Sequence, residues 1–213
     1  MKSPRQRQLA YRLLGSLCLY PNHERIGTLR AAAEEMQQDH HWWSDSAFAD
    51  SWRPLWETLS QLQESPSIAI EEEYTRLFLA NAFAPPYESF YLDQQGHVRG
   101  VIAVQLEREY ASAGLAPSPS LKEPTDHIAV ELEFMSYLCD LEAQALESED
   151  LDTANEVSQR QSRFLSTHLG RWVPAFARQV QKGEAGRLYG KVANAIDAFV
   201  RLDLTTPASL SSH

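Results

Sequence analysis

Apolar side chains recur at intervals of three and four residues along almost the whole chain. Leu9, Leu13, Leu17 and Tyr20 stand at i, i+4, i+8 and i+11, and Pro21 follows them. A stripe at this spacing is typical of an amphipathic helix, and a proline ends it. The same period predicts helices at 24–38, 46–63, 67–81, 99–113, 126–147, 151–168, 172–182 and 186–203. Because no segment shows a strand pattern, we predict an all-α helical bundle of roughly nine helices.

Individual residues mark several of the predicted helix ends. Ser67 is placed to cap the fourth helix, whose early glutamates, Glu71–Glu73, suit the positive end of the helix dipole. Gly114 is the expected C-terminal cap of the helix at 99–113.

Prolines divide the chain near its middle. Three of them, Pro117, Pro119 and Pro124, fall within the ten residues of LAPSPSLKEP. A stretch this rich in proline is typical of a linker or hinge. We therefore predict an N-terminal helical part at 1–114, a hinge at 115–124 and a C-terminal helical part at 125–213.

Composition and charge narrow the choice of partners. The 213 residues are 43% apolar and 10% aromatic, enough for one domain or two small helical lobes with a substantial core. The formal charge of −10 argues against nucleic acid or an anionic membrane surface as the main partner. A basic partner fits this charge better.

The first twenty residues superficially resemble an export signal. Lys2, Arg5 and Arg7 precede an apolar run, Leu13–Tyr20, but the run has only eight residues and no small-x-small cleavage site follows it. No run approaches the roughly 20 apolar residues of a membrane span. Cys18 and Cys139 lie within apolar helical patterns, as buried free thiols in a reducing compartment do. We expect a cytoplasmic protein.

The stretch EPTDHIAVELEFM, residues 123–135, carries titratable groups at a predicted helix start. Asp126 is a candidate N-cap, and His127 and Glu131, at i and i+4, share one face of the helix. They could act as an acid/base pair or form part of a docking surface. A metal site needs three or four ligands, and neither a second such pair nor the lone His40-His41 dipeptide supplies them. No nucleophile motif or phosphate loop is present, so no cofactor and no metal are predicted.

Two further surfaces suit a peptide that carries both apolar and basic residues. In APPYESFY, residues 84–91, two prolines stiffen a segment that presents Tyr87, Glu88, Phe90 and Tyr91. Between Asp126 and Asp150 there are eight acidic residues and no lysine or arginine. The acidic run is either a solvated helix face or a face for a basic ligand, and the tyrosines either pack between helices or contact a ligand.

These motifs together resemble the TorD/DmsD/NarJ family of redox-enzyme maturation chaperones. The resemblance rests on EYTRLFLANAFAPPYESFY, on EPTDH some thirty residues later, and on RWVPAF with Trp172, Pro174 and Phe176. It covers about residues 8–200. It implies an all-helical cytoplasmic chaperone, not an enzyme. Such proteins bind the precursor of a molybdopterin oxidoreductase, often at its twin-arginine signal peptide, and hold it until the molybdenum cofactor is inserted.

The expected binding site combines the two motifs. We predict peptide contacts from a set of nine residues: Pro86, Tyr87, Glu88, Ser89, Phe90, Tyr91, Asp126, His127 and Glu131. Arginines of the ligand should meet Glu88, Asp126 and Glu131. The expected assembly is a monomer with a minor domain-swapped dimer, as the resemblance implies. A helical nucleotide-binding regulator and an acid/base enzyme using His127 and Glu131 remain alternatives.

Overall fold

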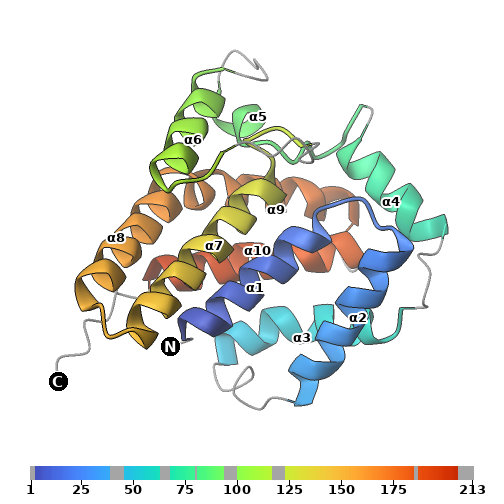
Figure 1. Cartoon of the computed structure of the whole chain (residues 1–213). Coiled ribbons are helices and arrows are strands. Elements are labelled where there is room, and N and C mark those ends of the chain that lie inside the picture. The colour runs from blue at the N-terminus through green and yellow to red at the C-terminus, as the bar shows by residue number, and fades with distance from the viewer. Residues whose placement is uncertain are drawn as a thin grey trace. The chain divides into compact units, whose positions relative to one another are not determined.

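The protein is helical throughout the described residues, which are 3–38, 46–62, 68–79, 81–93, 100–116, 123–184 and 187–205 of a computed structural model (Figure 1). Within these ranges there are ten helices and no strand. Their bounds are α1 Pro4–Leu17, α2 His23–Gln38, α3 Ser46–Ser60, α4 Ile68–Phe78, α5 Glu88–Leu92, α6 Val101–Ser112, α7 Ile128–Glu147, α8 Leu151–Thr167, α9 Leu169–Glu184 and α10 Leu188–Thr205. The all-α prediction is confirmed.

The eight helices predicted from residue 24 onward match observed helices to within three residues at each end, and two differences affect the site. The five-residue helix α5 lies within the segment that the prolines had marked as a loop. Helix α9 begins at Leu169, three residues earlier than predicted, so that only His168 separates it from α8. The predicted cap Ser67 lies outside the described residues, as do His40 and His41.

The described chain packs into two compact units that do not follow the order of the sequence. Among the described residues, unit 1 contains those within 3–15 and 86–172, and unit 2 contains those within 16–85 and 173–205. The division passes through helices α1 and α9. The predicted boundary at 115–124 does not coincide with it, and because residues 117–122 lie outside the described ranges, the hinge stays a prediction.

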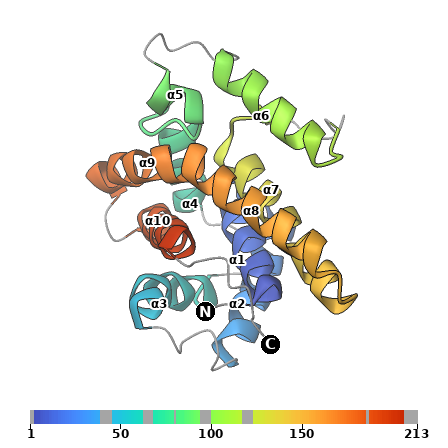
Figure 2. The ribbon, with the colours of Figure 1, turned by 90° about the vertical axis from the view of Figure 1, so that its left-hand side faces the viewer.

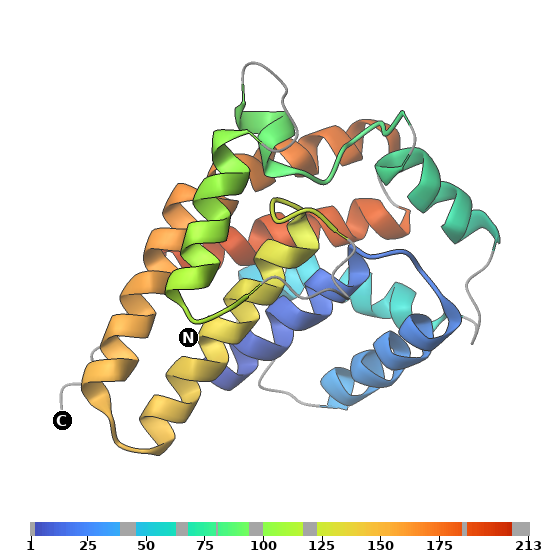
Figure 3. The same cartoon turned by 45° about the horizontal axis from the view of Figure 1, so that its top comes forward.

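Unit 1 is built on the antiparallel pair α7 and α8, which lie side by side with α1 along α7 (Figures 1 and 3). Helix α1 approaches α7 closely at Gly15. A Cβ added there would lie 3.2 Å from the carbonyl oxygen of Ala129 and 3.4 Å from Cβ of Leu132. Leu13 and Leu17 of the predicted stripe are buried, as are Ala10 and Leu14, whereas Leu9 and Tyr20, at 36% and 43%, are exposed.

The acidic run on α7 meets arginines from the chain itself. Arg5 donates to both carboxylate oxygens of Glu147, each at 2.9 Å, and also to Asp140. Arg7 lies 3.2 Å from Glu142 and donates to the buried Gln161. The acidic face of α7 is therefore paired in part with two arginines at the start of α1, and not only with a separate basic ligand.

Unit 2 has an aromatic core centred on α3 and α10, which are neighbouring helices (Figure 2). Trp52 packs against Trp56 and Phe199 with ring centroids 5.3 and 5.6 Å apart, and all three are buried. The buried Glu73 accepts a 3.0 Å hydrogen bond from the backbone N–H of Tyr189. Glu73 thus caps the start of α10.

Two helices of unit 1 end in the same hydrogen-bonded turn. After α6, Gly114 has φ +81°, and the N–H of Leu115 donates to Tyr110 O. After α7, Glu149 has φ +60°, and the N–H of Asp150 donates to Ala145 O. Both are Schellman turns, in which glycine is the favoured residue at the position with positive φ. The predicted cap at Gly114 is confirmed.

Candidate functional site

A backbone bridge joins the two sequence motifs in unit 1. Tyr87 and His127 form an isolated antiparallel β-bridge. Ile128 N–H donates to Pro86 O, and Glu88 N–H donates to Asp126 O, both at 2.9 Å. The Tyr87 and His127 rings meet edge to face at 5.4 Å. The segment that begins at Pro86 is thereby fixed against the start of α7.

Asp126 caps a different helix from the one predicted. Its Oδ2 accepts hydrogen bonds from the N–H and Oγ of Ser89, at 3.3 and 2.5 Å, within the first turn of α5. The N-cap of α7 is His127, whose Nδ1 accepts from Ala129 N–H at 3.1 Å. The prediction of Asp126 as N-cap of α7 was wrong, because the side chain turns toward the helix brought next to it by the bridge.

Glu88 forms a buried pair with a histidine 80 residues away. His168 Nδ1 lies 2.9 and 3.1 Å from the two carboxylate oxygens of Glu88. Glu88 is 1% exposed and His168 6%. A charged group buried to this extent needs a partner, and His168, in the junction between α8 and α9, supplies it.

Glu131 is completely buried and accepts a hydrogen bond from Trp172 Nε1 at 3.2 Å. Burial and the charge of Glu88 raise the pKa of Glu131 well above its ordinary value, and the Trp172 N–H opposes this rise. The charge of Asp126 and a hydrogen bond shared with the Glu88 carboxyl raise the pKa further. The Glu131 carboxyl therefore favours its protonated form, which can donate a hydrogen bond to Glu88.

His127 is held in the neutral form. Because its Nδ1 accepts a hydrogen bond, the ring proton is on Nε2, which faces Glu123 Oε2 at 3.8 Å. Burial lowers the pKa of His127 from 6.5 to about 4. A neutral imidazole is what the cap of α7 requires, since protonation of Nδ1 would remove the acceptor.

We name this set of side chains the buried polar cluster: Glu88, Ser89, Asp126, His127, Glu131, His168 and Trp172. Asp126 Oδ1, a carboxyl oxygen of this cluster, has no hydrogen-bond partner among the described residues. Tyr110 lies beside the cluster and donates to Thr125 O at 2.9 Å. Burial and the charges of Glu131, Glu88 and Asp126 raise the pKa of Tyr110.

The outer side of the same segment is apolar and accessible. Phe90 is 56% exposed, and the half-buried rings of Tyr87 and Tyr91 flank it in sequence. Tyr91 is also stacked on Trp172 with ring centroids 5.5 Å apart. Glu123 is a carboxylate accessible at this surface, and its side chain is 32% exposed. Glu123 is one of the charges that raise the pKa of Tyr87, after burial itself.

The structure therefore separates the nine predicted site residues into two groups. Tyr87, Phe90 and Tyr91 reach the surface, whereas the other six, including all three carboxylates expected to meet arginine, are buried. No pattern in the sequence singles out His168 or Glu123, and Trp172 is marked there only as part of the RWVPAF segment. The histidine gave no signal because its partner is 80 residues away.

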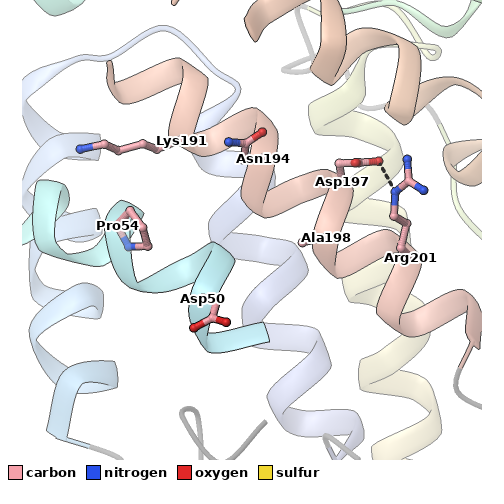
Figure 4. A pocket seen from close by; sticks show the side chains of 7 residues that line it. All are labelled: Asp50, Pro54, Lys191, Asn194, Asp197, Ala198 and Arg201. Carbon is pink, nitrogen blue, oxygen red and sulfur yellow. Dashed lines mark hydrogen bonds and ion pairs between the residues drawn. The ribbon is translucent and has the colours of Figure 1, made fainter. Parts of the chain in front are cut away.

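A hollow lies in unit 2 between α3 and α10, with a volume of about 340 Å³ (Figure 4). Its basic groups are already engaged: Lys191 Nζ donates to Thr58 Oγ1 at 2.6 Å, and Arg201 Nε donates to Asp197 at 2.9 Å. Asp50 adds a further negative charge to the lining. This mixed lining gives no support to the nucleotide-binding alternative.

Neither a metal cluster nor a membrane helix occurs in the described ranges. Within them, no three His, Cys, Asp or Glu side chains are grouped so that they could hold a metal ion. In the same ranges, no helix has the length and apolar character needed to cross a bilayer.

Several known proteins resemble this chain in fold or in sequence. A solved structure described as a redox enzyme maturation protein from Archaeoglobus fulgidus has the same fold, with a TM-score of 0.62, 24% identity and coverage of 91% of this chain and 93% of that one. The chaperone protein TorD of Vibrio cholerae is 35% identical over 153 residues, which are 70% of this chain and 68% of the relative. The TorD of Vibrio parahaemolyticus is 31% identical over 153 residues, 70% of each chain.

The class defined by these relatives is a helical chaperone, not an enzyme, so the acid/base alternative is wrong. A family model described as nitrate reductase delta subunit matches residues 44–178. The chain belongs to this family, the NarJ/TorD family of redox-enzyme maturation chaperones.

Proposed function

We propose that the chain binds the precursor of a molybdopterin-dependent oxidoreductase in the cytoplasm, through the N-terminal signal region and the folded part of the client. Binding holds the client back from twin-arginine export until its cofactor is inserted. The observation that carries this proposal is the segment Pro86–Tyr91, which presents apolar rings outward while the buried polar cluster fixes its backbone.

The exposed rings suit the apolar run of a signal peptide. Phe90 is a large apolar side chain that is 56% exposed, and burying such a side chain against a ligand contributes roughly 1.5–3 kcal/mol. The backbone bridge at Tyr87 and His127 orders the segment before a ligand arrives, so little conformational entropy is lost on binding.

Glu123 is the accessible acceptor for a basic residue of the same ligand. It lies beside Tyr87 and His127, and its side chain is partly exposed. Direct contact between a client arginine and Glu88, Asp126 or Glu131 requires these buried groups to become accessible first. We therefore assign Glu123 to the first contact and the buried carboxylates to fixing the segment.

Calorimetric titration with a synthetic precursor signal peptide tests the proposal. Phe90→Ala should weaken binding by about tenfold or more, from the burial energy above. Glu123→Gln should weaken it by a similar factor, since a hydrogen bond to a charged group contributes roughly 1.5–3 kcal/mol. Leu151→Ala is the matched control for Phe90→Ala, because Leu151 is 67% exposed on the same unit but at the start of α8. Unchanged affinity in both test variants would show that the segment is not the docking surface.

A further inference from the structure

Helix α5 is held in place from outside. A helix of five residues is not stable by itself in water. Asp126 binds the N–H and hydroxyl of Ser89, its carbonyl oxygen accepts from Glu88 N–H, and His168 binds the Glu88 carboxylate. Helix α5 also contacts α6, the next helix along the chain (Figure 2). The place of α5 therefore depends on a few polar contacts from the residues just before α7 and from the α8–α9 junction, together with the stack of Tyr91 on Trp172.

The closed arrangement leaves its acceptors incompletely satisfied. Asp126 Oδ1 is buried and has no donor within the described part of the chain. Buried acceptors without donors destabilise the state that contains them. Within the described residues, His168 binds the Glu88 carboxylate, Ser89 donates to Asp126, and the Trp172 indole donates to Glu131. A guanidinium has five N–H donors and would satisfy several of these oxygens together.

The proposal here rests on the function proposed above. We propose that α5 is a strap over the buried carboxyl groups, and that the His168–Glu88 pair is the latch that keeps the strap closed. When the strap opens, Glu88, Asp126 and Glu131 become accessible to a cationic group of the client, which takes the place of the chain's own donors. His168 thus controls the fraction of molecules in which the strap is open and the client can bind.

Two substitutions of His168 separate the latch from simple packing. His168→Leu removes the donor and leaves Glu88 buried without its partner. His168→Asn keeps an N–H donor near the position of Nδ1. Ser89→Ala loosens the strap independently by removing one hydrogen bond to Asp126. Ser136→Ala is the matched control, because Ser136 is buried in the same unit and donates to Gln8 O, away from the strap.

Hydrogen exchange measured by mass spectrometry reports the opening of the strap. In His168→Leu, exchange of the amides at 88–92 should rise about tenfold or more, the effect of a lost hydrogen bond to a buried charged group. Exchange within 151–165 should stay at the wild-type rate. Ser89→Ala should show a smaller rise at 88–92, while His168→Asn and Ser136→Ala should resemble the wild type.

Affinity for the precursor peptide supplies the second measurement. If only the open form gives full contact, the apparent dissociation constant falls in proportion to the open population. His168→Leu should therefore bind about tenfold more tightly, and His168→Asn should bind like the wild type. Unchanged exchange at 88–92 in both His168→Leu and Ser89→Ala would overturn the latch, and so would weaker binding that accompanies faster exchange. If no variant binds the peptide, the proposed function fails, while the exchange data still decide whether His168 holds the strap.

Discussion

Replacing His127 by asparagine should remove a specific part of the pH dependence of stability. The imidazole is 1% exposed, and its Nδ1 caps α7 by accepting from Ala129 N–H. Asparagine is a favoured N-cap, and its side-chain oxygen can take the place of Nδ1. The substitution therefore keeps the cap and removes the titrating group.

The magnitude follows from the lowered pKa of His127. Burial lowers this pKa from 6.5 to about 4, so the folded state resists protonation that the unfolded chain accepts. The contribution of neutral His127 to the free energy of unfolding is fully present above pH 6.5 and is lost as the pH falls toward 4. Each pH unit in this window corresponds to about 1.4 kcal/mol, so lowering the pH from 7.5 to 5 should cost the wild type about 2 kcal/mol that His127→Asn does not lose.

Urea unfolding followed by circular dichroism at several pH values between 5 and 7.5 measures this difference. Any cost of the smaller side chain is the same at every pH, so only the change in the difference matters. His23→Asn, which removes an exposed imidazole, shows how much of the change accompanies the loss of any histidine. If the wild type and His127→Asn keep a constant difference within about 0.5 kcal/mol across this range, the fold does not hold His127 neutral.

Further predictions concern other features of the chain. Glu131→Gln should remove a loss of stability that the wild type shows as the pH rises. Because the pKa of Glu131 is raised in the folded state, the protonated carboxyl contributes to the free energy of unfolding at pH 4, and this contribution is lost as the pH rises through the folded pKa. Unfolding of the wild type and the variant at pH 5–8 tests this. Gly114→Ala should destabilise by about 1 kcal/mol and Glu149→Gly should stabilise by a similar amount, because both positions have positive φ in the same type of turn; thermal unfolding of the two variants should move in opposite directions. Arg5→Ala should lower the stability only slightly, and less still in 1 M salt, since Arg5 is 45% exposed; a large loss that salt does not reduce would contradict this. Light scattering after refolding should find a monomer with a minor domain-swapped dimer, and a single species under all conditions would remove the support for swapping.

Helical periodicity accounts for what could be predicted of the fold. Helices such as α7 and α8 are long enough to show several turns of apolar spacing, and their bounds were predicted to within two residues. Helix α5 has too few residues to show a period, and the two prolines before it indicate a loop. A helix of this length depends on contacts with distant residues, which no local pattern in the sequence reveals.

The candidate site was predictable as a pair of motifs but not as a set of contacts. Resemblance to a family indicated that PPYES and EPTDH belong together, and the bridge at Tyr87 shows how they meet. The preference of aspartate for N-cap positions predicted that Asp126 caps the nearest helix, α7, whereas its side chain accepts hydrogen bonds from Ser89, 37 residues earlier. Arg5 and Glu147 are 142 residues apart, so an acidic helix face could not be matched with its partner from spacing alone.

The contacts of α5 also impose an order in time on a chain that is made from its N-terminus. When residues 88–92 are synthesised, neither of the side chains that will hold them exists. Asp126 follows Ser89 after 37 residues, and His168 follows Glu88 after 80. The segment Pro86–Tyr91 is therefore synthesised before the side chains that hold it. Its first partner, Asp126, is added just before α7, and its second, His168, only when α8 is complete. A nascent chain stopped before residue 168 should carry the rings of the segment without the histidine that positions them.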